Sequence, residues 1–117
     1  MSAHAQFMAG RPFRCEVVPD GDGVAIRLHG ELDVATAPEV DAAFADIAER
    51  RVPVTVDLRR LTFMDSRGVR MLVAFHDQAR ADGFHLTVAC GDPARQLLSL
   101  TGLDRHLRMV ELPNDST

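Results

Sequence analysis

The 117-residue sequence contains no lysine, tryptophan or tyrosine, and all 13 of its basic residues are arginines. The missing lysine excludes a Schiff-base lysine, a lysine general base and the lysine of a phosphate-binding P-loop. The formal net charge is -4 at pH 7, whereas a nucleic-acid backbone demands a basic face. We therefore expect neither a lysine-dependent enzyme nor a nucleic-acid-binding protein.

Cysteine is also scarce, and so are long apolar runs. Cys15 and Cys90 lie far apart and form no CxxC pair, which indicates two free thiols in a reducing compartment. The longest apolar runs, such as Met71–Phe75, are too short to cross a bilayer, and residues 1–12 lack the apolar core of a signal peptide. We expect a cytoplasmic protein that meets a membrane only through a partner.

Histidines are present but scattered, at His4, His29, His76, His85 and His106. None stands at the spacing typical of metal ligands in a sequence motif. His76 falls on the apolar stripe of a predicted helix, where we interpret it as a packed histidine with its hydrogen bonds satisfied. We expect no metal site and no cofactor.

The composition is that of one globular domain, with 46% hydrophobic and 26% charged residues. Residues 1–12 show no periodicity and predict a flexible tail. The folded domain is expected to cover residues 13–113, and residues 114–117 form a short C-terminal tail.

The domain is predicted to begin with a β-hairpin. Phe13–Val18 forms the first strand, and Pro19–Gly23 is a strong turn because proline fixes φ and glycine accepts positive φ. Apolar and polar residues then alternate over 24–29, the period of a strand.

Helix and strand patterns alternate after the hairpin. Helices are predicted from about residue 36 to 50, from 65 to 82 and from 92 to 101. Strands are predicted over 52–58, 86–90 and 109–112. The order ββαβαβαβ is typical of an α/β fold with a mixed, mostly parallel sheet of about five strands.

Two helix starts carry specific capping signals. Thr36 and Glu39 match a capping box, in which the hydroxyl accepts from the amide of Glu39 and the glutamate side chain returns a hydrogen bond. Asp92 precedes Pro93 and is predicted to be an N-cap.

Polar residues gather after two predicted strands, in 31–36 and 62–68. The carboxyl ends of parallel strands are where such sheets bind ligands and partners. Ser66 falls in the first turn of a helix, where unpaired amides and the helix dipole favour negative charge. Arg67 and Arg70 could add donors, and Arg59 and Arg60 complete the basic residues near this edge. A phosphoserine at position 66 would be accommodated there.

These two segments together resemble the STAS domain, a family that joins sulfate transporters with anti-sigma factor antagonists. The resemblance is carried by Gly30–Pro38, by Val56–Leu58 and by Phe63–Gly68. It spans about residues 13–113 and includes the order of the elements.

The resemblance implies a phosphorylation switch. In stand-alone members, an anti-sigma factor that is also a serine kinase phosphorylates the serine after the aspartate of this motif, which is Ser66 here. The unphosphorylated protein binds that kinase and so releases a sigma factor, and a serine phosphatase resets the cycle. Arg67 replaces a serine or threonine that is common in the family. We expect the arginine either to alter kinase docking or to pair with the phosphate. The predicted partner-binding residues are Asp33, Thr36, Asp65, Ser66, Arg67, Gly68 and Arg70.

Purely structural roles remain open for the same residues. Ser66 or Asp65 can be a helix N-cap. Asp33 and Thr36 can end a strand and start a helix, and Gly68 can permit a close backbone approach.

The residues also bear on three rival functions. A hydrolase nucleophile elbow needs G-x-S-x-G, but Met64 stands where the first glycine belongs. A phosphoacceptor receiver could use Asp57, but Asp20 and Asp22 lie in a turn and the lysine of receivers is missing. A STAS subunit of a lipid-transport or stress-signalling assembly, without serine phosphorylation, is the remaining alternative. We expect a binding module rather than an enzyme, as a monomer or weak dimer.

Overall fold

Five strands form one mixed sheet in the order β1-β2-β3-β4-β5. The computed structural model describes residues 13–110; the predicted tails, 1–12 and 114–117, lie outside them. The predicted order ββαβαβαβ is confirmed, with one added 3-10 helix before the last strand. The elements are β1 (Arg14–Asp20), β2 (Gly23–Leu32), α2 (Ala37–Arg50), β3 (Val54–Met64), α3 (Ser66–Asp82), β4 (Leu86–Cys90), α4 (Asp92–Thr101), the 3-10 helix (Leu103–Arg105) and β5 (Met109–Val110).

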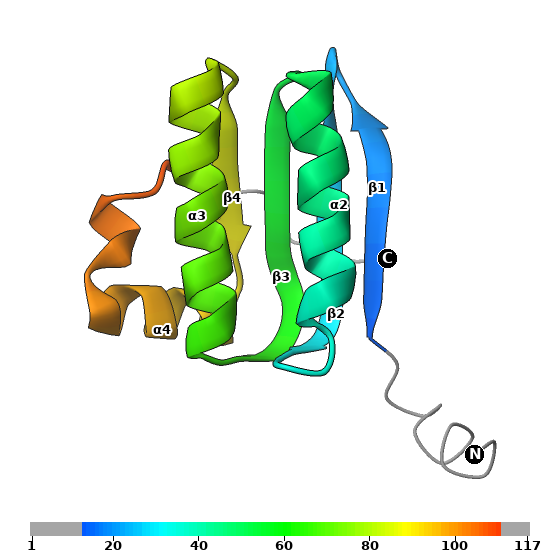
Figure 1. Cartoon of the computed structure of the whole chain (residues 1–117). Coiled ribbons are helices and arrows are strands. Elements are labelled where there is room, and N and C mark those ends of the chain that lie inside the picture. Colours follow the sequence, from blue (N-terminus) through cyan, green and yellow to red (C-terminus); the bar gives the residue numbers. More distant parts are fainter. Residues whose placement is uncertain (1–12, 111–117) are drawn as a thin grey trace, which may run out of the picture.

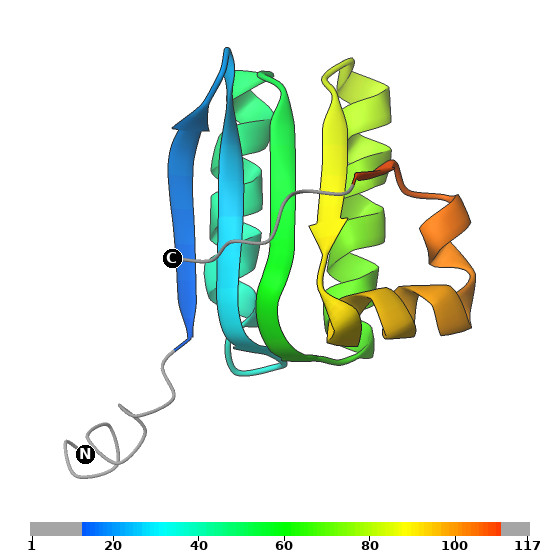
Figure 2. The same cartoon turned by 180° about the vertical axis from the view of Figure 1, so that it is seen from behind.

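The sheet is parallel except for its first strand. β1 pairs antiparallel with β2, as the hairpin predicts, and β2, β3, β4 and β5 pair in parallel. Helices α2 and α3 lie side by side on one face (Figure 1). Helix α4 packs against β3, and within residues 13–110 no helix covers the opposite face of β1 and β2 (Figure 2).

The core lies between the sheet and these two helices. Alternate residues of β3, such as Val56 and Leu58, are fully buried, because successive side chains of a strand point to opposite faces. Phe44 of α2 stacks on Phe75 of α3 with ring centroids 4.1 Å apart. Apolar burial on this face supplies the main driving force for the fold.

β3 is longer than the sequence pattern predicts. The prediction ended near residue 58, whereas the strand continues to Met64, so Thr62–Met64 is strand rather than loop. Its pairing with β2 passes two irregularities and resumes to bring Leu32 opposite Met64. Period-2 alternation is lost at these irregularities, which explains why the pattern ended early.

The C-terminal ends of the helices agree with the prediction, whereas the start of α4 does not. Gly83 and Gly102 follow α3 and α4 in the left-handed conformation, as expected of C-terminal glycines. Asp92 was predicted to be the N-cap, but it is the first helical residue and Gly91 is the N-cap. In the described range, no helix combines the length and the apolar character needed to span a membrane.

Candidate functional site

The two predicted segments meet at the edge of the sheet where β2 and β3 end. Leu32 and Met64 are register partners, and the Asp65 amide donates to the Leu32 carbonyl at 3.3 Å. The loops that enter α2 and α3 therefore lie next to each other, at the bottom of Figure 1. This juxtaposition brings the predicted site residues to one edge.

The loop before α2 is held by its own side chains. The Thr36 hydroxyl donates to the Glu31 carbonyl at 2.8 Å and accepts from the Asp33 amide at 3.0 Å. Asp33 Oδ1 accepts from the amides of Ala35 and Thr36. The predicted capping box is wrong, because the Thr36 side chain makes no cap hydrogen bond and the Glu39 amide donates to the Thr36 carbonyl instead. The hydroxyl is already engaged across the loop.

Asp65 caps α3, and Ser66 is the first helical residue. One Asp65 carboxylate oxygen accepts from the amides of Arg67 and Gly68, at 3.0 and 3.4 Å. Of the two capping alternatives, the structure therefore selects Asp65. It also corrects the expectation of unpaired amides beside Ser66, because the aspartate already occupies two of them.

Ser66 is exposed to solvent. Arg67 and Arg70 are also exposed. Arg70 lies one helical turn beyond Ser66 and shares its face of α3. The Ser66 side chain is therefore accessible to a modifying enzyme.

Gly68 is buried at this junction because side chains from both strands pack against it. A methyl group at this position would lie 2.6 Å from Met64 Cγ and 3.0 Å from Leu32 Cδ2. The predicted close approach at Gly68 is therefore a contact between α3 and the ends of β2 and β3. Its role is to let α3 start close to the sheet.

Two exposed apolar residues at the same edge were missed by the sequence analysis. Val34, in the loop before α2, is 66% exposed, and Phe63, near the end of β3, is 47% exposed. Phe63 is the register partner of Glu31. Large apolar side chains in otherwise polar segments were the available signal.

The comparisons with known proteins agree with this architecture. Residues 15–111 match the family model described as Mlab, STAS domain. The chain belongs to the STAS domain family. The family predicted from the two sequence segments is therefore confirmed.

Relatives of this STAS domain include regulatory proteins. It is 29% identical over 101 residues to the anti-sigma-F factor antagonist RsfB of Mycobacterium tuberculosis, covering 85% of this chain and 83% of RsfB. Its fold matches the crystal structure of an anti-sigma factor antagonist from Mycobacterium paratuberculosis with a TM-score of 0.77 and 23% identity, over 84% and 85% of the two chains. It also matches SpoIIAA in its unphosphorylated form, with a TM-score of 0.70, 22% identity and coverage of 89% and 90%.

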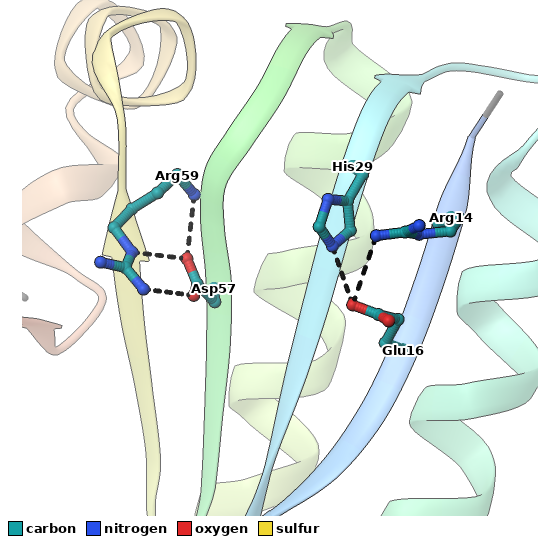
Figure 3. A network of polar contacts seen from close by, with 5 residues as sticks. All are labelled: Arg14, Glu16, His29, Asp57 and Arg59. Atoms are coloured by element: carbon teal, nitrogen blue, oxygen red, sulfur yellow. Dashed lines mark hydrogen bonds and ion pairs between the residues drawn. The ribbon is translucent and has the colours of Figure 1, made fainter. Parts of the chain in front are cut away.

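The face of the sheet opposite α2 and α3 carries a buried ion pair. Asp57, on β3, is 5% exposed. Its carboxylate accepts from Arg59 through the backbone amide, Nε and Nη2, at 3.0, 3.0 and 2.8 Å (Figure 3). Burial acts to raise the pKa of Asp57, but the hydrogen bonds from Arg59 outweigh it and hold the pKa below its usual value.

This ion pair corrects the expected position of Arg59 and accounts for the environment of Asp57. Arg59 was grouped with the basic residues near Ser66, but its guanidinium is bound to Asp57 on the other face. Asp57, the residue weighed as a receiver phosphoacceptor, is engaged by the same guanidinium and by a backbone amide. Its role here is structural.

A second polar cluster lies on β1 and β2 of the same face. His29 Nε2 lies 3.0 Å from Glu16 Oε1, and Arg14 Nη2 lies 3.8 Å from the same oxygen (Figure 3). The hydrogen bond from His29 is the main reason that the pKa of Glu16 is lowered. Because Glu16 is well exposed, solvent screens these charges and the cluster adds little stability.

The two thiols are poor nucleophiles. Cys15 is half-buried and Cys90 is buried, and both are free. Burial raises the pKa of each thiol to about 11, with Glu39 adding to the effect at Cys15. Both are protonated at neutral pH, whereas reactive cysteines require the thiolate.

Proposed function

We propose that this STAS domain is an anti-sigma factor antagonist regulated by phosphorylation of Ser66. The unphosphorylated chain binds an anti-sigma factor that is also a serine kinase, and thereby releases a sigma factor in the cytoplasm. A serine phosphatase removes the phosphate and restores binding. The observation that carries the proposal is the exposed Ser66 hydroxyl at the start of α3, in a chain related to the antagonist RsfB.

The local charges suit a reversible modification. A negative group at a helix N-terminus gains about 0.3–1 kcal/mol from the dipole, although the nearby Asp65 carboxylate opposes it. Arg67 and Arg70 supply positive charge on the exposed side. The phosphorylated domain should therefore stay folded, and the switch acts on the surface that meets the partner.

That docking surface is defined here as Val34, Phe63, Ser66, Arg67 and Arg70. The apolar side chains offer area that a partner can remove from water, and interfaces draw most of their affinity from a few such residues. A phosphate of charge about −1.5 to −2 at Ser66 would place a strongly hydrated group beside them. Desolvation and repulsion at the interface then oppose binding.

Ser66 is expected to be the phosphate acceptor. Incubation with ATP and the anti-sigma factor of its own cell should add one phosphate to the wild-type chain and none to Ser66→Ala. Intact-mass spectrometry followed by peptide sequencing measures this directly. Ser99→Ala, which alters an exposed serine of α4, is the matched control and should still be modified. Phosphate on both variants alike would refute Ser66 as the acceptor.

The apolar part of the docking surface makes a separate prediction. Phe63→Ser should weaken binding of the unphosphorylated chain to the anti-sigma factor by about tenfold or more, because Phe63 is a large exposed anchor. Isothermal titration calorimetry measures the affinity. Leu100→Ser is the control, because Leu100 is also exposed, at 78%, but lies on α4. Equal losses for both variants would contradict this placement of the surface.

The alternative is a STAS subunit of a lipid-transport or stress-signalling assembly that works without phosphorylation. The matched family model has the description Mlab, STAS domain, which does not name an anti-sigma factor antagonist. Under this alternative, Ser66 remains unmodified in protein purified from its own cells. Intact-mass spectrometry of that material therefore separates the two functions.

A further inference from the structure

A histidine of α3 has an unusual environment away from the docking surface. The His76 side chain is 12% exposed, and its Nδ1 is buried without a hydrogen-bond partner in the described part of the chain. Buried polar atoms almost always have a partner, so such an exception needs an explanation. The expectation of a satisfied, packed histidine is therefore wrong for this nitrogen.

The fold places two further residues with polar side chains, Asp77 and His106, next to His76. Asp77 follows it on α3, with Oδ1 3.6 Å from His76 Nδ1. His106, distant in sequence, lies between the 3-10 helix and β5, and its ring centroid is 5.1 Å from that of His76. Buried Leu107, whose amide donates to the Leu103 carbonyl, anchors the segment that carries His106. The three residues are therefore placed together by the fold.

We propose that His76, Asp77 and His106 form a binding site for a divalent transition-metal ion of the zinc class. One ligand atom from each residue lies within 4.8 Å of the other two. A tetrahedral zinc ion with bonds near 2.0–2.1 Å needs ligand atoms about 3.3 Å apart. Asp77, at 62% side-chain exposure, and His106 are both exposed, so their side chains can reorient to bring the ligand atoms closer together.

The donor set selects the class of metal. Two imidazoles and one carboxylate suit Zn²⁺, Ni²⁺ or Co²⁺, whereas Mg²⁺ and Ca²⁺ prefer oxygen ligands alone. Arg80 and Arg108 line a hollow of about 300 Å³ beside His76 and repel cations in general. Binding therefore depends on direct bonds to nitrogen, which transition metals form and Mg²⁺ and Ca²⁺ do not favour.

The site would connect α3 with the segment that follows α4. An ion bound only by the folded chain raises its stability as the ion concentration increases. It would thus fix the segment around His106 against the middle of α3. This effect is independent of the proposed phosphorylation of Ser66.

Calorimetry with ZnCl₂ on the untagged full chain tests the proposal. We expect one saturable Zn²⁺ site per chain and none for Mg²⁺, with a Zn²⁺-dependent rise in melting temperature. His106→Ala should weaken Zn²⁺ binding by at least about tenfold and abolish the rise in melting temperature. His85→Ala is the matched control, because His85 is an exposed histidine lining the same hollow.

Two results of these experiments would contradict the proposed metal site. Because His106 is exposed, His106→Ala is expected to fold, and Asp77→Ala gives a second variant at an exposed position. Absence of a saturable Zn²⁺ site in the wild type would overturn the proposal. Equal weakening by His85→Ala and His106→Ala would also overturn it, because it would indicate adventitious binding to surface histidines.

Discussion

Ser66→Glu and Ser66→Asp are expected to bind the anti-sigma factor at least about 100-fold more weakly than Ser66→Ala. Placing an unpaired charge in an interface costs several kcal/mol, and each 1.4 kcal/mol is a tenfold change in affinity. Ser66→Ala keeps the neutral surface, so it should bind as tightly as the unphosphorylated wild type and should not be switched off by ATP. The loss comes from the docking surface, because the helix dipole favours the added charge.

Affinity is measured by titration calorimetry with the anti-sigma factor, identified first by pull-down with Ser66→Ala from the protein's own cells. Ser99→Asp adds the same charge on α4, outside the docking surface, and should bind as the wild type does. Circular dichroism confirms that each variant is folded. Equal affinities for Ser66→Ala and Ser66→Glu would show that negative charge at Ser66 does not control binding.

Asp57→Asn is expected to lower the free energy of unfolding by about 3 kcal/mol at pH 7. Removing one partner of a buried ion pair costs about 3–5 kcal/mol because the other charge loses its compensation. The low end of that range applies, since Arg59 is 19% exposed and can regain some water. The double variant Asp57→Leu/Arg59→Met removes both charges and should recover most of the loss.

The effect of Asp57→Asn also depends on pH. Because the folded-state pKa of Asp57 is lowered, the ion pair stabilises the protein above the ordinary aspartate pKa of about 4. That contribution is lost as the pH falls through the lowered pKa. The difference between wild type and Asp57→Asn should therefore be largest near pH 7 and shrink in acid.

Urea unfolding of both proteins across this pH range measures the difference. Asp46→Asn is the control, because Asp46 is exposed on α2 and its replacement should change stability by no more than about 0.5 kcal/mol. If the free energy of unfolding of Asp57→Asn at pH 7 equals that of the wild type, the ion pair makes no net contribution to stability. A constant difference at all pH values would show that the loss is not electrostatic.

The regular part of the fold was predictable from local pattern. Alternating apolar residues defined the strands, and Gly83 and Gly102 defined helix ends because left-handed backbone favours glycine. The end of β3 was not predictable in this way. Pairing with β2 extends the strand to Met64. Strand pairing is a tertiary effect, so the local alternation of residues does not reveal it.

The candidate site was likewise predictable only in part. Ser66 and its neighbours could be proposed from the sequence because they are contiguous and follow a strand. The hydrogen bonds of Thr36 were mispredicted, since its hydroxyl is engaged by Glu31 and Asp33 rather than by Glu39. The proximity of His76 and His106 had no sequence signal, because it depends on how the chain returns after α4.

The outer strand β1 has a consequence for association. It combines the charged residues Arg14, Glu16 and Asp20 with Pro19. Charges and proline are among the means by which natural proteins prevent strand-to-strand aggregation at exposed edges. The β1 edge is thus poorly suited to growth by β-strand addition, which directs recognition there to side chains rather than to backbone pairing.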